Sequence, residues 1–295
     1  FTATADESLL AYPEIDVIVR GEGEQTLVEL VNAVKNSRAL SDIKGISFQK
    51  DHRIFHNPDR PLISDLDQLP MPAYRFVENY MRKYHFTMMA GKATYALVEG
   101  SRGCPHHCTF CSQWKHWRGT WRSKSPKRIA DEFEFLHSDF GTDFLWLTDD
   151  NLGAGNRVKE VADEIVQKGF PDDLMWFVQA RCDDVVRNSS LLPKMSKAGI
   201  NYMLLGVESH SKNTLDGFHK GIKPEDTVSA VKLLRQNGIF SQASCIIGDR
   251  KDSEESMAAL REFVNYVDSD IAIFMVLTPF PGTDLYEEAS RGGWV

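Results

Sequence analysis

The sequence predicts an α/β fold built on a parallel sheet, and two observations lead to that prediction. From Tyr95 onward, short apolar runs alternate with segments in which apolar residues recur at helical spacing. After the first unit, successive runs are separated by roughly the thirty-odd residues of one βαβ crossover. Six such units in order imply a parallel sheet with helices outside it, either open or rolled into a partial (βα)6 TIM-like barrel.

The six strands are expected where apolar runs are bounded by polar or glycine positions. Between them lie helical patterns, such as the one that Val158, Val161, Ala162 and Ile165 form. The alternation of strand and helix is the only repeat in the chain. The expected strands lie at 95–99, 144–148, 174–179, 202–206, 241–247 and 271–277.

The residues before this core predict a smaller element. A short apolar run at 16–20 leads through the glycine turn at 21–24 into a helical pattern that begins at Leu27. Two further apolar runs flank a polar turn and predict a hairpin within 45–55. The first part of the chain is therefore expected to be a small α/β unit of its own.

Prolines at 58, 61, 70 and 72 disfavour regular structure after the hairpin. We therefore expect a linker at 58–94, between a first part at 1–57 and the core at 95–295. Because the chain opens on Phe1, within what reads as the middle of a domain, we expect a fragment. The sequence leaves open whether the core domain is truncated at its C-terminus.

Composition excludes several classes of protein. The chain of 295 residues, with 42% hydrophobic and 26% charged positions, is typical of a soluble globular protein. A net charge of -8 without any basic tract argues against a nucleic-acid partner. There is no run of about 18 apolar residues to span a membrane and no signal-peptide pattern. Five cysteines, three of them clustered, do not form a secreted disulfide framework, so we expect a cytoplasmic protein.

Polar and glycine residues follow the expected strands, where side chains of a parallel barrel meet at one mouth. For any single one of them, a role as a helix cap or a turn residue would be a sufficient explanation. Six such positions beside a thiol cluster favour a functional site. The residues after the strands are, in order, the cysteine loop, Asp149-Asp150-Asn151, Gln179 with Arg181, Glu208, Gly248 and the turn at 278–282.

The cysteine loop carries the most specific signal. Cys104, Cys108 and Cys111 form the pattern C-x3-C-x2-C, and Pro105 disfavours a helix across the first gap, so a loop can wrap three sulfurs around one centre. A structural zinc site would need a fourth ligand, for which His106 or His107 is available but awkwardly placed. An iron-sulfur cluster is the better match, because three thiolates leave one iron open for a substrate or cofactor.

This motif, with Phe110 just before the last cysteine and a βα repeat around it, resembles the radical S-adenosylmethionine superfamily. The resemblance implies a [4Fe-4S] cluster on Cys104, Cys108 and Cys111, with S-adenosylmethionine on the open iron. One-electron reduction, by a donor such as flavodoxin or ferredoxin, would then cleave the cofactor to a 5′-deoxyadenosyl radical that abstracts hydrogen from a small-molecule substrate.

The resemblance also assigns cofactor contacts to strand-end residues. Asp149, Asp150 and Asn151 occupy the position that binds the amino group, although Gly-Gly-Glu is common there in the family. Arg181 and Glu208 match positions that contact the ribose or carboxylate. The residues up to Gly248 resemble a motif near adenine, without the usual Pro-Gly after it, and Phe110 would lend backbone contacts to adenine.

The order of elements before the core is similar to the class of these enzymes with a cobalamin (B12)-binding domain. It implies that 1–57 is the C-terminal part of a Rossmann-like domain that binds cobalamin in the full-length protein. The Asp-x-His-x-x-Gly segment that supplies a cobalt ligand in many such domains is absent from this sequence.

The stretch Cys-Ser-Gln-Trp-Lys-His-Trp-Arg at 111–118 looks most like anaerobic magnesium-protoporphyrin IX monomethyl ester cyclases and the P-methylase group. Its tryptophans could equally pack a loop against the core. Oxidative cyclisation of a tetrapyrrole and methyl transfer from methylcobalamin to carbon or phosphorus are the two reactions implied, and a zinc-stabilised Cys3His module is the alternative of another class. Cys182 and Cys245 are expected to be buried and inert.

Overall fold

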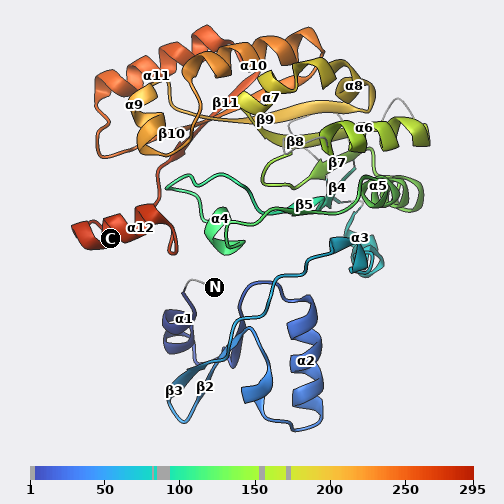
Figure 1. Ribbon diagram of the computed structural model, residues 1–295, viewed down its shortest axis with the longest axis vertical. Helices are drawn as coiled ribbons and strands as arrows, with labels where there is room; N and C mark the ends of the chain where they lie inside the picture. The colour runs from blue at the N-terminus through green and yellow to red at the C-terminus, as the bar shows by residue number, and fades with distance from the viewer. Residues whose placement is uncertain (1–3, 82, 85–93, 153–156, 171–173) are drawn as a thin grey trace. The chain divides into compact units, whose positions relative to one another are not determined.

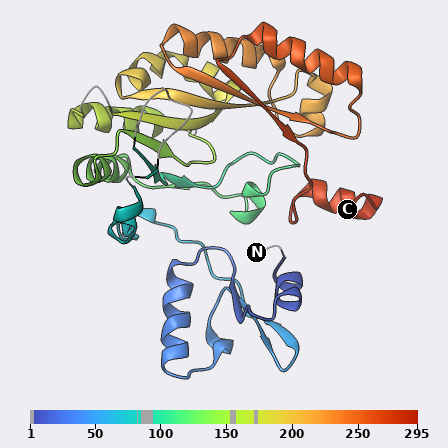
Figure 2. The ribbon, with the colours of Figure 1, turned by 180° about the vertical axis from the view of Figure 1, so that it is seen from behind.

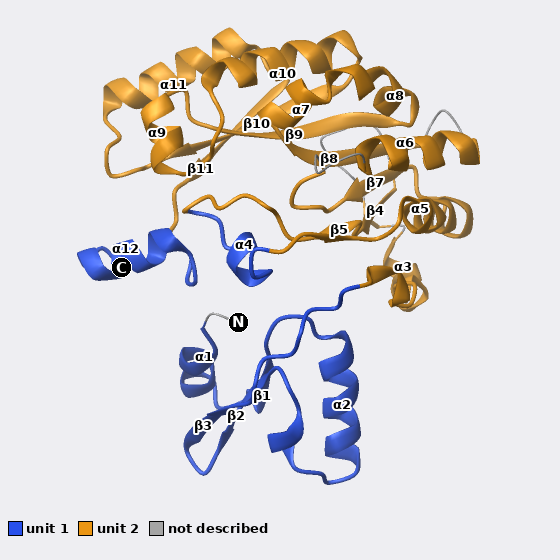
Figure 3. Ribbon diagram, in the orientation of Figure 1, with its two compact units in different colours: residues 1–64, 110–119, 279–295 blue, residues 65–109, 120–278 orange. Residues whose placement is uncertain are grey.

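The chain forms two units, which Figure 3 colours separately. The larger unit holds residues 65–109 and 120–278, and the smaller unit holds 1–64, 110–119 and 279–295. The computed structural model describes residues 4–81, 83–84, 94–152, 157–170 and 174–295.

The larger unit is built on a six-stranded parallel sheet in the order β11-β10-β9-β8-β7-β4 (Figure 1). The predicted α/β fold with a parallel sheet is therefore confirmed. Neighbours in the sheet are neighbours in the chain, as successive βαβ units require. The strands are β4 (Tyr95–Val98), β7 (Phe144–Leu147), β8 (Met175–Arg181), β9 (Ile200–Glu208), β10 (Phe240–Ile247) and β11 (Ile271–Val276).

Two strands run further than the apolar runs predict. The expected end of the third strand was residue 179 and that of the fourth was residue 206, but β8 ends at Arg181 and β9 at Glu208. Backbone pairing explains the difference, because Arg181 pairs with Gly206 and Glu208 pairs with Cys245, and a ladder can continue through polar residues once the flanking strand is in register. Arg181 and Glu208 are therefore the last residues of strands and do not lie in loops.

Helices cover one face of this sheet, as Figures 1 and 2 show. The main apolar core lies between these helices and the sheet. Among the described residues, no helix is both long enough and apolar enough to cross a membrane. The helices of this unit are α3 (Glu78–Met81), α5 (Pro126–Phe140), α6 (Arg157–Lys168), α7 (Cys182–Arg187), α8 (Leu192–Lys197), α9 (Lys212–Gly217), α10 (Pro224–Gln236) and α11 (Glu254–Val267), with short 3-10 turns at 66–68, 74–77 and 189–191.

The opposite face carries a second apolar cluster, which lies at the amino ends of the strands. Phe177 of β8 contacts Trp146 and Tyr202, with ring centroids 5.0 and 4.8 Å apart, and Tyr202 contacts Phe240 at 4.9 Å. Side chains alternate along a strand, so every second residue after Phe177 and Tyr202 points to this same face. The alternation brings Arg181 to the carboxyl end of that face. The register of β9 shifts before Glu208, but its Oε1 atom lies 2.8 Å from where a Cβ atom of Gly206 would stand on that face.

A two-stranded pair closes the cysteine loop, which sequence reasoning did not predict. β5 (Ser101–Arg102) pairs with β6 (Arg122–Ser123) in antiparallel register. The N–H of Lys124 also donates to the carbonyl of Gly100 at 2.9 Å. This pair is called the neck below, because the loop that carries the three cysteines begins and ends there.

In the smaller unit, the predicted strand, helix and hairpin are all present. β1 (Val17–Val19), β2 (Ile46–Lys50) and β3 (Arg53–His56) form an antiparallel sheet in that order. Among the described residues, β1 pairs with β2 alone. The helices are α1 (Ala5–Ala11), α2 (Glu24–Lys35), α4 (Gln113–His116) and α12 (Asp284–Gly292), with a 3-10 turn at 40–42.

The glycine turn at 21–24 has a structural role in this unit. The buried Glu22 carboxylate accepts the N–H of Ile63 at 2.6 Å, and Arg60 donates to the Thr26 hydroxyl at 2.8 Å. These bonds hold the first part of the predicted linker on the glycine turn and on α2. Its later part is tied to the larger unit, where Tyr74 donates to the carbonyl of Leu97 at 2.8 Å, while residues 82 and 85–93 lie outside the described part.

Candidate active site

The expected site residues of the larger unit all lie at the carboxyl ends of its strands. The cysteine loop follows β4, Asp149 to Asn151 follow β7, Arg181 ends β8, Glu208 ends β9 and Gly248 follows β10. The carboxyl ends of parallel strands in one sheet share an edge, which is where α/β enzymes bind ligands. Phe110 and Cys111 belong to the smaller unit.

The cysteine loop is irregular throughout its cysteine-bearing part. Cys104 and Cys108 lie outside helices and strands, and Gly103 before them has a φ of +95°, a conformation that only glycine adopts easily. Within the larger unit, the N–H of Thr109 donates to the carbonyl of Phe218 at 3.0 Å. The backbone next to Cys108 is thereby fixed to the segment between α9 and α10.

Two cations stand near Cys108. Burial raises the pKa of the Cys108 thiol, while Lys220 and Arg181 act to lower it. Thiolates are the metal-binding form of cysteine, so positive charge beside a thiol assists ligation. Three thiols in a loop, one of them beside two buried cations, fit the donor set of an iron-sulfur cluster.

Glu208 and Lys220 form a buried ion pair. The Nζ atom of Lys220 lies 2.7 Å from Oε1 of Glu208, and each residue is 7% exposed. Burial acts to lower the pKa of Lys220, but the Glu208 carboxylate and Cys108 outweigh it and the pKa is raised. A Cβ atom on Gly206 would lie 2.5 Å from this Nζ atom, so glycine at this position leaves room for the pair.

Lys220 was missed by sequence reasoning. It lies in a loop after a short helix, and no motif or apolar run marks it. The backbone of Glu208 gives a further sign of constraint, because its φ of +61° is unusual for a residue with a side chain. Such strained backbone is common at functional sites, and it can be recognised only in a structure.

Arg181 is held in place from two sides. Its Nε atom lies 2.9 Å from Oδ1 of Asp183, and its Nη2 atom donates to the carbonyl of Lys220 at 2.6 Å. At the end of β10, the N–H of Gly248 donates to the Asp252 carboxylate at 2.8 Å. The two predicted positions are thus both fixed by neighbours in the larger unit.

The three residues after β7 have different surroundings. Asp149 is 1% exposed, and its Oδ1 atom accepts the N–H groups of Gly100 and Ser101, each at 2.8 Å. Asn151 is also buried and donates to Asp184 at 3.0 Å. Asp150 is partly exposed. Of the three, Asp150 is therefore the side chain that is least shielded from solvent.

The two cysteines outside the loop are buried, as predicted. Cys182 begins α7 and Cys245 lies in β10, and both are fully shielded from solvent. Burial raises the pKa of Cys182 to about 11 and that of Cys245 to about 12. Both stay protonated at neutral pH, which disfavours them as metal ligands.

The histidines of the loop differ in exposure. His107 is exposed, whereas His106 is half-buried. Burial lowers the pKa of His106, and Arg181 lowers it further. His106 is therefore neutral at pH 7, and it lies near the same cation as Cys108.

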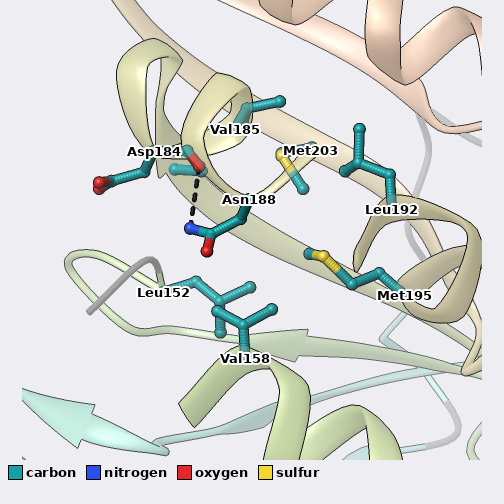
Figure 4. Close-up of a pocket in the computed structure, with 9 residues that line it drawn as sticks. Leu152, Val158, Asp184, Val185, Asn188, Leu192, Met195 and Met203 are labelled. Carbon is teal, nitrogen blue, oxygen red and sulfur yellow. Dashed lines mark hydrogen bonds between the residues drawn. The ribbon is translucent and has the colours of Figure 1, made fainter. Parts of the chain in front are cut away.

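A small cavity lies in the core between the helices and the sheet, beside Asp184, the residue that accepts the hydrogen bond from Asn151 (Figure 4). Its volume is about 20 Å³, and its lining is mostly apolar. The Asn188 side chain, which faces it, donates to the carbonyl of Asp184 at 2.9 Å. A space of this size holds about one water molecule, so it is no cofactor site. The other lining residues are Leu152, Val158, Ala180, Val185, Leu192, Met195 and Met203.

A parallel sheet with polar residues at its carboxyl edge, and with a thiol-rich loop after its first strand, is an arrangement typical of α/β enzymes. The profile of the Radical SAM superfamily matches residues 98–264, more than half of the chain. The chain belongs to the radical SAM superfamily of enzymes, whose members use a [4Fe-4S] cluster and S-adenosylmethionine. The predicted family and its two cofactors are confirmed.

Curated relatives carry two different activities. An uncharacterized methyltransferase of Pyrococcus horikoshii is 33% identical over 289 residues, which are 98% of this chain and 61% of the relative. The anaerobic magnesium-protoporphyrin IX monomethyl ester cyclase of Cereibacter sphaeroides is 34% identical over 281 residues, 94% of this chain and 45% of the relative. The chain thus spans about half of the length of these relatives.

A solved structure shares the fold along nearly the whole chain. The radical S-adenosylmethionine methyltransferase TsrM from Kitasatospora setae, solved with cobalamin and a [4Fe-4S] cluster bound, matches with a TM-score of 0.81. The match covers 98% of this chain and 58% of that chain at 20% sequence identity. At this identity the likeness concerns the fold.

Proposed function

We propose that Cys104, Cys108 and Cys111 hold a [4Fe-4S] cluster with one open iron, on which S-adenosylmethionine is cleaved to begin radical chemistry on a small organic substrate. The observation that carries the proposal is the irregular cysteine loop at the carboxyl edge of a parallel sheet, with Lys220 and Arg181 near Cys108. An external one-electron donor such as flavodoxin or ferredoxin would reduce the cluster.

The cofactor contacts are proposed for the residues around this loop. Asp150 would meet the amino group of S-adenosylmethionine, since it is partly exposed whereas Asp149 and Asn151 are buried. Arg181 and Glu208 lie on the face of the sheet without helices and would meet the ribose or the carboxylate. Phe110 and Gly248 would provide backbone contacts near adenine. A partial (βα)6 barrel, with helices on the outside only, agrees with this arrangement.

Residues 1–57 are proposed as the C-terminal part of a cobalamin-binding domain. Two features support an incomplete unit: β1 pairs on one side alone among the described residues, and α2 leaves apolar side chains exposed. A longer protein would complete the sheet and bind cobalamin. Residues 58–94 would then link this domain to the core.

Two reactions are supported by relatives of nearly equal similarity. Oxidative cyclisation of a tetrapyrrole is our first candidate, on the likeness to the cyclase and on the stretch at 111–118. Methyl transfer that depends on cobalamin is the second, since a methyltransferase relative is 33% identical. Both reactions begin with the same cluster and the same cleavage of S-adenosylmethionine.

The three thiols can be tested by substitution under anaerobic reconstitution. Replacing Cys104, Cys108 or Cys111 by alanine should abolish stable cluster assembly, measured as bound iron and sulfide, because a cluster with one open iron has no spare ligand. Cys182→Ala and Cys245→Ala are the matched controls and should retain the cluster. Addition of S-adenosylmethionine to the reduced wild-type protein should change its electron paramagnetic resonance spectrum.

Two results would contradict this assignment. One is loss of iron in a control variant together with its retention in a loop variant. The other is a colourless protein with one bound zinc that needs His106 or His107, which would favour the Cys3His module.

A further inference from the structure

The neck of the cysteine loop is fixed by a single buried carboxylate. The Oδ1 atom of Asp149 accepts the N–H groups of both Gly100 and Ser101 at 2.8 Å. Asp149 follows β7, while Gly100 and Ser101 follow the neighbouring strand β4. The carboxylate thus ties the beginning of the loop to the next strand of the sheet.

The other side of Gly100 is fixed as well. Its carbonyl accepts the N–H of Lys124, and Ser101 and Arg102 pair with β6. Cys104 follows the neck after Gly103 alone, so the position of its sulfur depends directly on where the neck stands. Backbone restraint at Gly100 is therefore transmitted to the first cysteine over a few bonds.

Arg157 supplies the opposite charge. Its Nη1 atom lies 2.7 Å from Oδ2 of Asp149, and the two residues are 5% and 1% exposed. The guanidinium also lies over the ring of Trp121, 5.6 Å from its centre. Within the described residues, Asp149 is the only carboxylate paired with Arg157.

The pair is packed directly against the neck. A Cβ atom on Gly100 would lie 2.6 Å from Nη2 of Arg157, 2.8 Å from Cδ1 of Leu147 and 3.0 Å from Oδ1 of Asp149. A side chain at this position would have to displace Arg157 or Leu147, so glycine lets the backbone and the ion pair lie close together.

We propose that Asp149 is a positioning residue for the cysteine loop, with Arg157 as the counter-ion that holds its carboxylate in place. Asp149 accepts hydrogen bonds from the backbone of the loop, and the proposed cofactor contact of this segment is made by Asp150. The inference rests on the proposed role of the three cysteines. In the cluster-free protein too, however, Asp149 and Arg157 should restrain Gly100 and Ser101.

The test compares Asp149→Asn, Arg157→Met and the double variant in the 295-residue chain. Asp149→Asn keeps an oxygen acceptor but leaves Arg157 buried without an anion, which strongly destabilises such a site. The double variant removes both charges and keeps similar volumes, so it should recover much of the loss. Two readouts are used: hydrogen exchange at Gly100 and Ser101 in the cluster-free protein, and the rate at which a ferrous chelator removes iron from the reconstituted protein.

We expect Asp149→Asn to accelerate exchange at both amides by about tenfold or more, the factor that corresponds to one hydrogen bond with a charged group. Iron release should accelerate as well, and the double variant should return both rates toward wild type. Leu234→Ala is the control, because it lowers the stability of the core from α10 without touching the neck.

Three results would overturn the inference. The first is unchanged exchange in Asp149→Asn. The second is iron release as fast in Leu234→Ala as in Asp149→Asn. The third is a loss of S-adenosylmethionine affinity with unchanged exchange, which would make Asp149 a cofactor contact. Because exchange is measured without the cluster, failure of the cysteine assignment would not be mistaken for failure of this inference.

Discussion

Helices α10 and α2 have similar amphipathic sequences but very different surroundings. In the larger unit, Val231 and Leu234 of α10 are at most 1% exposed. In the smaller unit, Val31 and Val34 of α2 are 56% and 66% exposed, and Leu27 and Val28 are exposed to a similar degree. The pattern in a sequence predicts which face of a helix is apolar, but it does not predict whether this chain contains the partner that covers it.

The ion pairs of the two units differ in the same way. The larger unit contains buried pairs, such as Lys124 with Glu132, at 4% and 0% exposure of their side chains. In the smaller unit, Asp59 and Glu29 pair with arginines while about half exposed. Among the described residues, ion pairs with both side chains buried thus occur in the larger unit, whereas each pair of the smaller unit has at least one exposed partner.

The largest expected effect contrasts the two helices directly. Leu234→Ala should lower the free energy of unfolding of the larger unit by about 2–5 kcal/mol, because it leaves a cavity in a packed core. Val31→Ala removes a mostly exposed side chain and should change stability by about 0.5 kcal/mol or less. Urea denaturation followed by tryptophan fluorescence and circular dichroism measures both. Equal losses would show that the apolar face of α2 is covered in solution.

The next effect concerns two glutamates that are each 7% exposed, Glu208 in the larger unit and Glu22 in the smaller. Glu208→Gln keeps the volume beside Lys220 but removes the negative charge, which leaves Lys220 buried without its anion and should also lower the stability of the larger unit. If Glu208 accepts hydrogen bonds from the ribose, affinity for S-adenosylmethionine should fall by about 1.5–3 kcal/mol, as for other charged hydrogen bonds.

Calorimetry on the reconstituted protein measures this affinity. Glu22→Gln is the matched control, since Glu22 holds the backbone of Ile63, and its affinity should equal that of the wild type. The cluster content of both variants should be unchanged. Equal affinities for the two variants would remove Glu208 from the proposed contacts.

Much of the larger unit could be predicted from the sequence, for a physical reason. The strands of a parallel sheet are near-continuous apolar runs in the sequence, and each of the six runs matched a strand. The polar ends of β8 and β9 could not be predicted, because backbone pairing with a neighbouring strand extends each of them. The family could be recognised because its cysteines are close in sequence.

The contacts of the site were much harder to predict. Lys220 meets Glu208 across 12 residues, and Asp149 meets Gly100 across 49. Such pairs depend on how strands are placed side by side, which local patterns do not record. The segment Asp149-Asp150-Asn151 shows what local sequence patterns cannot predict. Its three adjacent polar residues look equivalent in the sequence, but they differ in burial.

The smallest expected effect tests the surface character of the smaller unit. Lys115 of α4 lies 2.6 Å from Asp284 and 2.8 Å from Glu287 of α12, and its side chain is 27% exposed. Lys115→Met keeps the apolar stem and removes the charge. Exposed pairs contribute about 1 kcal/mol at most, so the variant should lose no more than that, and about 1 M salt should reduce the difference.

The pH dependence of this loss follows from the pKa of Lys115, which the hydrogen bonds to Asp284 and Glu287 raise above its ordinary value. The protonated form is then favoured in the folded state, so the stabilisation is fully present below about pH 10.4, the ordinary lysine pKa. It disappears as the pH rises through the raised pKa of the folded state. Urea midpoints of wild type and variant should therefore differ by a constant amount from pH 7 to 9 and converge at higher pH. A difference of several kcal/mol, or one that ignores salt, would mean that Lys115 is buried and that the contrast between the two units fails at α4.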